Sequence, residues 1–316
     1  MSEYGRRLKT VDIAIGIFLI FAITVIGYFA LFGGHSQAGI SKAAPVEVHF
    51  IDVGQGDSIL VKAGDKSMLV DGGRQVEGPK LVSYLKSQGI TSIDVLVATH
   101  PHADHIGGLL SVLREIPVKE VLDSGMPYTT KTYEDYLTLI DRKNIPYTVA
   151  EAGQTFQLGP DVKVEVLAPP VSKNDGGVNE NSIVLKVIHH NVSFLLMGDA
   201  GIPEEMQILS SGYDLKSDVY KVPHHGSQYS AYWAFISAVS PVVSVIEVGP
   251  NKYGHPSKAE LSLLAQKGSA VYRTDQNGNI VVRSNGTAFT VTPEYEMTSA
   301  KVLSCSPSYG AMRCAT

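Results

Sequence analysis

Three histidines and an aspartate within six positions make the run from His100 to His105 the most constraining feature of this chain. The run reads His-Pro-His-Ala-Asp-His and directly follows Val95–Ala98, an apolar segment typical of a buried strand. A strand that ends in such a turn delivers several metal ligands to one point, because imidazole nitrogens and carboxylate oxygens both bind divalent cations. The run therefore predicts a site for one or two metal ions at the end of a strand.

Three further apolar segments end in polar side chains of the same kinds. They are followed by Asp71, by Asp199, and by the pair His224 and His225. Ligands gather at the carboxyl ends of strands in layered folds, so we expect these groups to converge on the histidine run. A set of unrelated surface histidines is the simpler alternative, and the repetition of the pattern disfavours it.

Residues 46–293 alternate dense strand and helix patterns, with strands followed by helices in each half. This pattern favours one α/β (α+β) domain of two packed sheets with helices on both outer faces. Residues 294–316 are predicted to be a loosely ordered C-terminal tail. The two cysteines of this tail, Cys305 and Cys314, are expected to form a small disulfide loop outside the cytoplasm, with two free thiols as the alternative.

A separate signal lies at the N-terminus. Residues 13–32 carry no charge and, at about 1.5 Å each, can cross a bilayer core of about 30 Å. Positive charges precede them, so the positive-inside rule predicts a cytoplasmic N-terminus over 1–12, a single-pass transmembrane anchor over 13–32 and a domain outside the cytoplasm. Residues 33–45 are predicted to be a linker. A cleaved signal peptide, which would give a secreted protein, is the alternative.

Charge narrows the classes of ligand. The chain has 316 residues, is 44% hydrophobic and carries a formal charge of −5. Because its first 45 residues are net positive, the remaining body is more acidic still. An acidic body argues against tight, non-specific binding to nucleic acid, which needs many lysine and arginine contacts to phosphate. Turnover of a polyanion held by metal ions stays compatible with this charge.

The run His100-x-His102-x-Asp104-His105 resembles the signature of the metallo-β-lactamase superfamily. Segments 49–58, 181–185, 223–227 and 251–256 resemble, more narrowly, the hydrolase domain of ComEC-type DNA-internalisation competence proteins, over about residues 46–292. The resemblance implies an αββα four-layer sandwich, preceded here by one transmembrane helix. The transporter of that family has many spans, so a chain with one cannot itself conduct DNA.

The resemblance also implies a set of metal ligands. Many members supply a further histidine for the first metal ion where this chain has Asn181 and Ser182. The resemblance therefore leaves two alternatives open: a pair of metal ions, or a single ion with the first site weak or empty. Zinc is favoured and manganese is the alternative. The implied ligands are His100 and His102 for one ion, Asp104 and His105 for the other, Asp199 as a bridge, and one or both of His224 and His225.

Catalytic roles follow from the same pattern. Two ions can share an activated water and clamp the oxygens of an in-line displacement. Asp71 is expected to orient a ligand through a hydrogen bond, although Asp-Gly-Gly is also a plain turn signal. His255 is expected to donate a proton to the leaving oxygen or to bind a phosphate oxygen. Asn181 and Ser182 complete the expected catalytic group, and Asn251, Ser182 and Ser227 are expected to hold non-bridging oxygens.

These features together predict a membrane-anchored, extracytoplasmic, metal-dependent hydrolase. A phosphodiesterase or nuclease is the leading hypothesis, with a phosphoester substrate such as DNA and the membrane as its partners. One alternative is a cell-envelope esterase that releases phosphorylcholine from a wall polymer. Another is a non-catalytic binding module on the same fold.

Overall fold

A computed structural model describes residues 44–172, 177–296, 303–308 and 311–315. The predicted membrane span over 13–32, its cytoplasmic flank 1–12 and nearly all of the linker lie outside the described residues. Among the helices that are described, none combines the length and apolar character that a membrane crossing needs.

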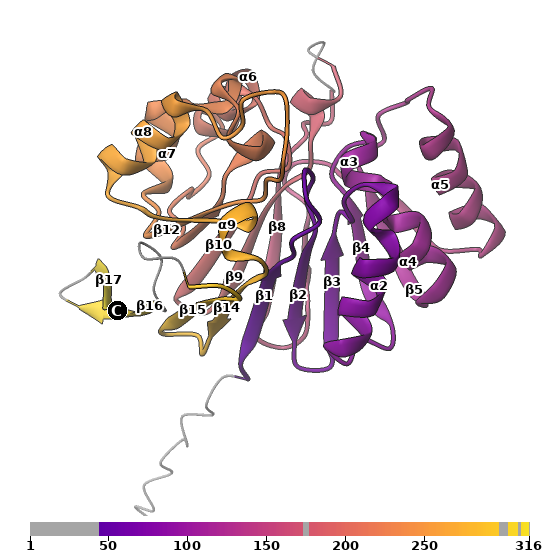
Figure 1. The fold of residues 1–316 in the computed structure, drawn as a ribbon, viewed down its shortest axis with the longest axis horizontal. Coiled ribbons are helices and arrows are strands. Elements are labelled where there is room, and N and C mark those ends of the chain that lie inside the picture. The colour runs from indigo at the N-terminus through magenta and orange to yellow at the C-terminus, as the bar shows by residue number, and fades with distance from the viewer. Residues whose placement is uncertain (1–43, 173–176, 297–302, 309–310, 316) are drawn as a thin grey trace, which may run out of the picture. The chain divides into compact units, whose positions relative to one another are not determined.

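Two sheets form the centre of the domain (Figure 1). The larger sheet has the strand order β17-β16-β15-β14-β1-β2-β3-β4-β5-β6 and is mixed, with β3 to β6 parallel. Its strands are β1 (Val46–Phe50), β2 (Ile59–Ala63), β3 (Lys66–Val70), β4 (Ile93–Ala98), β5 (Val118–Asp123), β6 (Tyr147–Val149), β14 (Ile280–Ser284), β15 (Phe289–Pro293), β16 (Leu303–Ser308) and β17 (Ala311–Ala315).

The smaller sheet has the order β13-β12-β11-β10-β9-β8-β7, with β10 to β13 parallel. Its strands are β7 (Thr155–Gln157), β8 (Val162–Ala168), β9 (Val184–His189), β10 (Val192–Leu196), β11 (Val219–Lys221), β12 (Val243–Ile246) and β13 (Ala270–Arg273).

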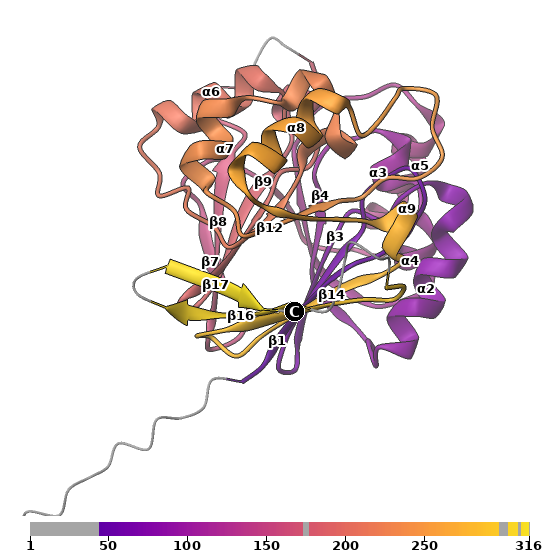
Figure 2. The same cartoon turned by 60° about the vertical axis from the view of Figure 1, so that its left-hand side comes forward.

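Helices cover the outer face of each sheet (Figure 2). Those on the larger sheet come from the first half of the chain, and those on the smaller sheet come from the second half. The first group is α2 (Gly78–Ser87), α3 (Ala103–Ile106), α4 (Leu109–Glu115) and α5 (Lys131–Arg142); the second is α6 (Ile202–Ser210), α7 (Trp233–Val239) and α8 (Lys258–Lys267), and α9 (Thr274–Asn277) leads from β13 towards β14.

Strand alternation explains the layers, because successive side chains of a strand point to opposite faces. In β2, Ile59 and Val61 pack between the two sheets, whereas Leu60 faces the helices of the larger sheet. In β10, Phe194 and Leu196 face the other sheet in the same way. Three apolar layers result, one between the sheets and one beneath each group of helices. The predicted αββα sandwich is confirmed.

The C-terminal residues differ from the expectation. The described parts form an antiparallel hairpin, β16 and β17, that extends the larger sheet from β15. Cys305 lies opposite Cys314 in the hairpin, and the two are joined by a disulfide, as expected. The prediction of a loosely ordered tail is wrong for these residues, because Cys305 is fully buried against the core between the sheets and holds the hairpin there.

Candidate metal centre

The carboxyl ends of β3, β4, β10 and β11 meet at one edge of the sandwich. A backbone hydrogen bond of 2.9 Å from Ile183 N to the Thr99 carbonyl joins the two sheets beside this point. Three overlapping groups have ligand atoms within 4.8 Å of one another: His100, His102 and Asp199; Asp104, His105 and His225; and Asp57, His105 and Asp199. The structure therefore brings together the strand ends that the sequence singles out.

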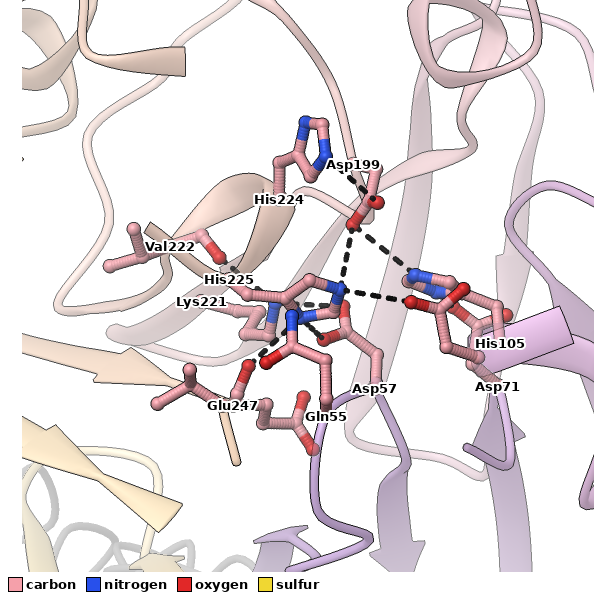
Figure 3. A network of polar contacts seen from close by, with 12 residues as sticks. Gln55, Asp57, Asp71, His105, Asp199, Lys221, Val222, His224, His225 and Glu247 are labelled. Carbon is pink, nitrogen blue, oxygen red and sulfur yellow. Dashed lines mark hydrogen bonds and ion pairs between the residues drawn. The ribbon is translucent and has the colours of Figure 1, made fainter. Parts of the chain in front are cut away.

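Asp199 lies at the centre of this cluster (Figure 3). Its Oδ2 is 3.7 Å from Nε2 of His100 and 3.7 Å from Nε2 of His224. Its Oδ1 is 3.3 Å from Nε2 of His105 and 3.7 Å from Nε2 of His225. Each carboxylate oxygen thus faces a different set of imidazoles, which is the arrangement that a bridging ligand needs.

The structure separates the roles of His224 and His225. Both adopt left-handed backbone conformations, with φ of 48° and 54°, in the turn that follows β11. His225 Nδ1 donates to the Glu247 carbonyl at 2.9 Å, which leaves its Nε2 facing Asp104 and Asp199. The His224 side chain is 27% exposed and lies on the Oδ2 side of Asp199, towards His100. His225 therefore joins Asp104 and His105, and His224 is placed to supplement the other group.

The donor set fits a cation. Nε2 of His105, Nε2 of His225 and Oδ1 of Asp199 are buried, and none of them has a hydrogen-bond partner among the described residues. Buried polar atoms without partners are costly, each by about 1–3 kcal/mol. A divalent cation between these atoms would satisfy all three at once.

The charges of the cluster lead to the same conclusion. Burial opposes protonation of His105, but the carboxylates of Asp199 and Asp71 outweigh burial and raise its pKa well above the usual value. Burial also opposes ionisation of Asp199, yet His105 and His225 hold its pKa well below the usual range. The cluster thus keeps its carboxylate charge and compensates it with a proton, and a bound metal ion would take the place of that proton.

Asp71 orients His105 rather than facing the hollow. Its Oδ2 is 2.7 Å from Nδ1 of His105, and its carboxylate accepts hydrogen bonds of 2.8 and 2.6 Å from the backbone and hydroxyl of Thr99. The side chain is fully buried, and the residue has a φ of 57°. This is the orienting contact expected from the sequence, and Thr99 is a partner that the sequence did not indicate.

Asn181 and Ser182 do not lie where a substrate-binding role requires. Both are fully buried and neither lines the hollow at the metal centre. Asn181 Nδ2 donates to the Gly177 carbonyl of its own loop at 2.6 Å. Ser182 Oγ accepts from Asp199 N at 3.2 Å and lies 3.5 Å from His100 Nδ1. The expectations that Ser182 holds a substrate oxygen and that Asn181 is catalytic are therefore corrected: Asn181 fixes its own loop, and Ser182 contacts the ligands behind the centre.

His255 does line the hollow, which has a volume of about 320 Å³. Burial, followed by the neighbouring His224 and His225, lowers its pKa to about 4. A ring with this pKa is neutral near pH 7, so it offers a hydrogen bond to a phosphate oxygen rather than a proton for the leaving group. Asn251 is fully engaged with its own loop, so the expectation that it binds substrate oxygens is also corrected.

Sequence reasoning missed a buried ion pair beneath the centre. Lys221 Nζ is 2.7 Å from Asp57 Oδ2, and both side chains are at most 2% exposed. Asp57 Oδ1 lies 3.2 Å from Nδ1 of His225, and its backbone N donates to the Asp104 carbonyl. A lysine inside the otherwise apolar segment 219–222 was the available signal. Asp52, on the same loop as Asp57, caps a turn by accepting from Gly54 N at 3.1 Å.

Three other histidines in the described part of the chain make contacts away from the metal centre. His49 is buried and its Nδ1 is 2.8 Å from the Tyr84 hydroxyl. His189 is 2.9 Å from the Ser284 hydroxyl, and His190 occupies the hairpin turn between β9 and β10 with a φ of 53°.

The fold is a four-layer sandwich, and a candidate metal site lined by histidines and aspartates lies at its strand ends. This combination is that of a metal-dependent hydrolase. The sequence pattern of the Metallo-beta-lactamase superfamily matches residues 51–246, and the chain belongs to this superfamily. Within it, the chain is similar to competence-related, ComEC-like proteins.

Two curated relatives illustrate this similarity. "ComE operon protein 3" of Bacillus subtilis is 32% identical over 276 residues, covering 79% of this chain and 35% of the relative. "Competence protein ComA" of Neisseria gonorrhoeae is 31% identical over 230 residues, covering 72% and 30%. The chain thus spans about a third of the length of these relatives.

A solved structure agrees on the fold. The metallo-beta-lactamase fold protein YhfI from Bacillus subtilis has a TM-score of 0.51 and 14% sequence identity, and the match covers 76% of this chain and all of YhfI. At this identity the likeness supports the fold alone.

Proposed function

We propose that this protein is a phosphodiesterase that uses two divalent cations, with zinc favoured over manganese. The observation that carries the proposal is the position of Asp199, whose two oxygens face separate sets of imidazoles at 3.3–3.7 Å. Two bound cations would supply Lewis acidity and an activated water for in-line displacement at phosphorus.

The residues of the chain prepare this reaction. Asp71 holds the ring of His105, the Glu247 carbonyl holds that of His225, and Ser182 holds the backbone of Asp199. These contacts fix the ligands before substrate binds, which is the usual function of groups behind a metal site. His255, neutral at the edge of the hollow, supplies a hydrogen bond to a phosphate oxygen.

DNA is the substrate that we propose. It is supported by the resemblance of segments 49–58 and 223–227 to ComEC-type proteins and by relatives named for competence. We further propose that residues 13–32 anchor the domain on the outer side of the cell membrane. Protease added to intact spheroplasts should then cleave the domain, and full protection would contradict this placement.

The test of function uses the purified full chain loaded with Zn²⁺ or Mn²⁺. We expect hydrolysis of bis-p-nitrophenyl phosphate and of single-stranded DNA, and a loss of at least about 100-fold in Asp199→Asn. Asp65→Asn is the matched control, since Asp65 is 87% exposed and lies in the turn before β3, at the opposite end of that strand from Asp71.

Other outcomes have clear meanings. Hydrolysis of p-nitrophenyl phosphorylcholine with no cleavage of DNA would favour the envelope esterase. An empty metal site at neutral pH would favour a binding module. Metal bound at the expected stoichiometry with no phosphoester cleaved would reject the proposed phosphodiesterase.

A further inference from the structure

A second hollow adjoins the metal centre. It has a volume of about 500 Å³ and shares Gln55, Ala103, Asp104 and Tyr253 with the lining of the hollow at the metal centre. The two are therefore parts of one continuous depression. We call the second hollow the side groove; its other lining residues are Arg74, Pro250, Asn251 and Lys252.

Two cations line the side groove. Neither the Arg74 guanidinium nor the Lys252 ammonium makes a hydrogen bond or ion pair within the part of the chain that the structure describes, and both residues are exposed. Among the described residues that line the groove, Asp104 is the only acidic one, and it belongs to the group that faces the metal centre. The acidic body of the protein thus presents unpaired positive charge beside its metal site.

The backbone that carries these cations is held in place. Asn251 fastens the loop around Lys252: its Oδ1 accepts from Tyr253 N and His255 N, and its Nδ2 donates to the carbonyls of Gly249 and His255, all at 2.8–3.1 Å.

The other wall is anchored through the glycines that precede Arg74. Gly72 N donates to the His105 carbonyl at 2.7 Å, and Gly73 N donates to the Asp57 carbonyl at 2.8 Å. The backbone before Arg74 is thus bonded to Asp57 and His105 of the metal centre, and the loop of Lys252 is bonded to His255, so hydrogen bonds within the protein position both cations before any ligand binds.

We propose that the side groove binds a second phosphate of the substrate, one or more units along the chain from the phosphate at the metal centre. This inference rests on the proposed function and narrows it: the substrate is an oligonucleotide with several phosphodiesters, and an isolated phosphodiester fills only part of the site. Tyr253, 66% exposed on the same loop, offers a face on which a base can stack without regard to sequence.

The experiment compares two substrates in one set of variants of the full chain. In Arg74→Ala/Lys252→Ala, we expect at least a tenfold rise in KM for a short single-stranded oligonucleotide. For bis-p-nitrophenyl phosphate, which carries one phosphate, KM and kcat should stay within about twofold of the parent. Arg74→Lys/Lys252→Arg keeps both charges and should recover most of the oligonucleotide affinity.

Arg114→Ala/Lys143→Ala is the matched control. These two residues also line a hollow, but beside Val118 at the amino end of β5, away from the metal centre. This double variant should leave both substrates unaffected, although it removes the same net charge from the protein.

Binding gives a readout that is independent of turnover. With metal removed by EDTA, the affinity for a fluorescent oligonucleotide should fall with salt, and the slope should shrink by about 0.7 for each phosphate that the groove variant no longer neutralises. Equal effects on both substrates, or an unchanged oligonucleotide KM and salt slope, would overturn the inference. Failure of the parent to cleave either substrate would instead reject the proposed phosphodiesterase.

Discussion

At the scale of single residues, the buried ion pair of Asp57 and Lys221 supports the metal centre, because Asp57 also contacts the ring of His225. Burial opposes ionisation of Asp57, but the Lys221 ammonium and the nearby His225 together outweigh burial and lower the pKa of Asp57. Burial, together with the charge of Asp57, raises the pKa of the nearby Glu247 well above its usual value. A negative and a positive charge therefore pair within the protein interior, 3.2 Å from the ring of His225.

Removal of one partner should be far more damaging than removal of both. Asp57→Asn leaves the Lys221 charge buried, so we expect a loss of about 3–5 kcal/mol in the free energy of unfolding. Asp57→Asn combined with Lys221→Met should recover most of that loss. Urea denaturation of the parent, both single variants and the double variant measures the coupling. Additive losses in the double variant would show that the pair does not act as a unit.

At the scale of elements, the sequence predicted the strand ends better than the turns. Each ligand-bearing strand is an apolar run with a clear end, so β4, β10 and β11 and their ligands could be inferred without coordinates. The distinction between His224 and His225 depends on two consecutive left-handed residues, which no periodicity reveals. The Asp57 and Lys221 contact joins residues 164 positions apart in sequence and depends on the packing of both sheets.

Helix α8 carries an acidic group that should make stability depend on pH. Glu260 is fully buried, neither of its carboxylate oxygens has a hydrogen-bond partner among the described residues, and burial raises its pKa to about 8. The folded protein therefore keeps a proton that the unfolded chain releases above its ordinary pKa of 4.5. Stability should fall as pH rises from about 4.5 to about 8, because the folded state binds more protons over that window.

Glu260→Gln tests this dependence. The variant should match the parent near pH 5 and exceed it at pH 8, by an amount on the order of a few kcal/mol, since each pKa unit corresponds to about 1.4 kcal/mol. Thermal melts between pH 5 and pH 8 compare the two, with the exposed Glu134→Gln as the control. Parallel pH profiles for parent and Glu260→Gln would contradict the prediction.

At the scale of the whole molecule, the candidate metal centre joins the two sheets. His100, His102 and His105 follow β4 of the larger sheet, whereas Asp199 and His225 follow β10 and β11 of the smaller one. A bound cation would therefore link the two halves of the sandwich directly, and its release would leave buried ligand atoms without partners on both sides.

Metal removal should lower the unfolding temperature of the domain. With free metal at 100 times its dissociation constant, binding to the folded state alone adds about 2.7 kcal/mol to stability. Calorimetry before and after chelation, followed by restoration of Zn²⁺, measures this effect. Asp199→Asn should unfold at nearly the same temperature with or without metal, and an equal response in parent and variant would place the cation elsewhere.

The disulfide in the hairpin of β16 and β17 also depends on the compartment in which the chain folds. Its two sulfur atoms join where oxidants prevail and stay apart where glutathione keeps thiols reduced. A chain that folded in the reducing cytoplasm would lack this disulfide between β16 and β17, at the edge of the larger sheet. An exported chain would form and keep it. The oxidation state of Cys305 and Cys314, measured in protein taken directly from cells, therefore reports the compartment in which the domain folded.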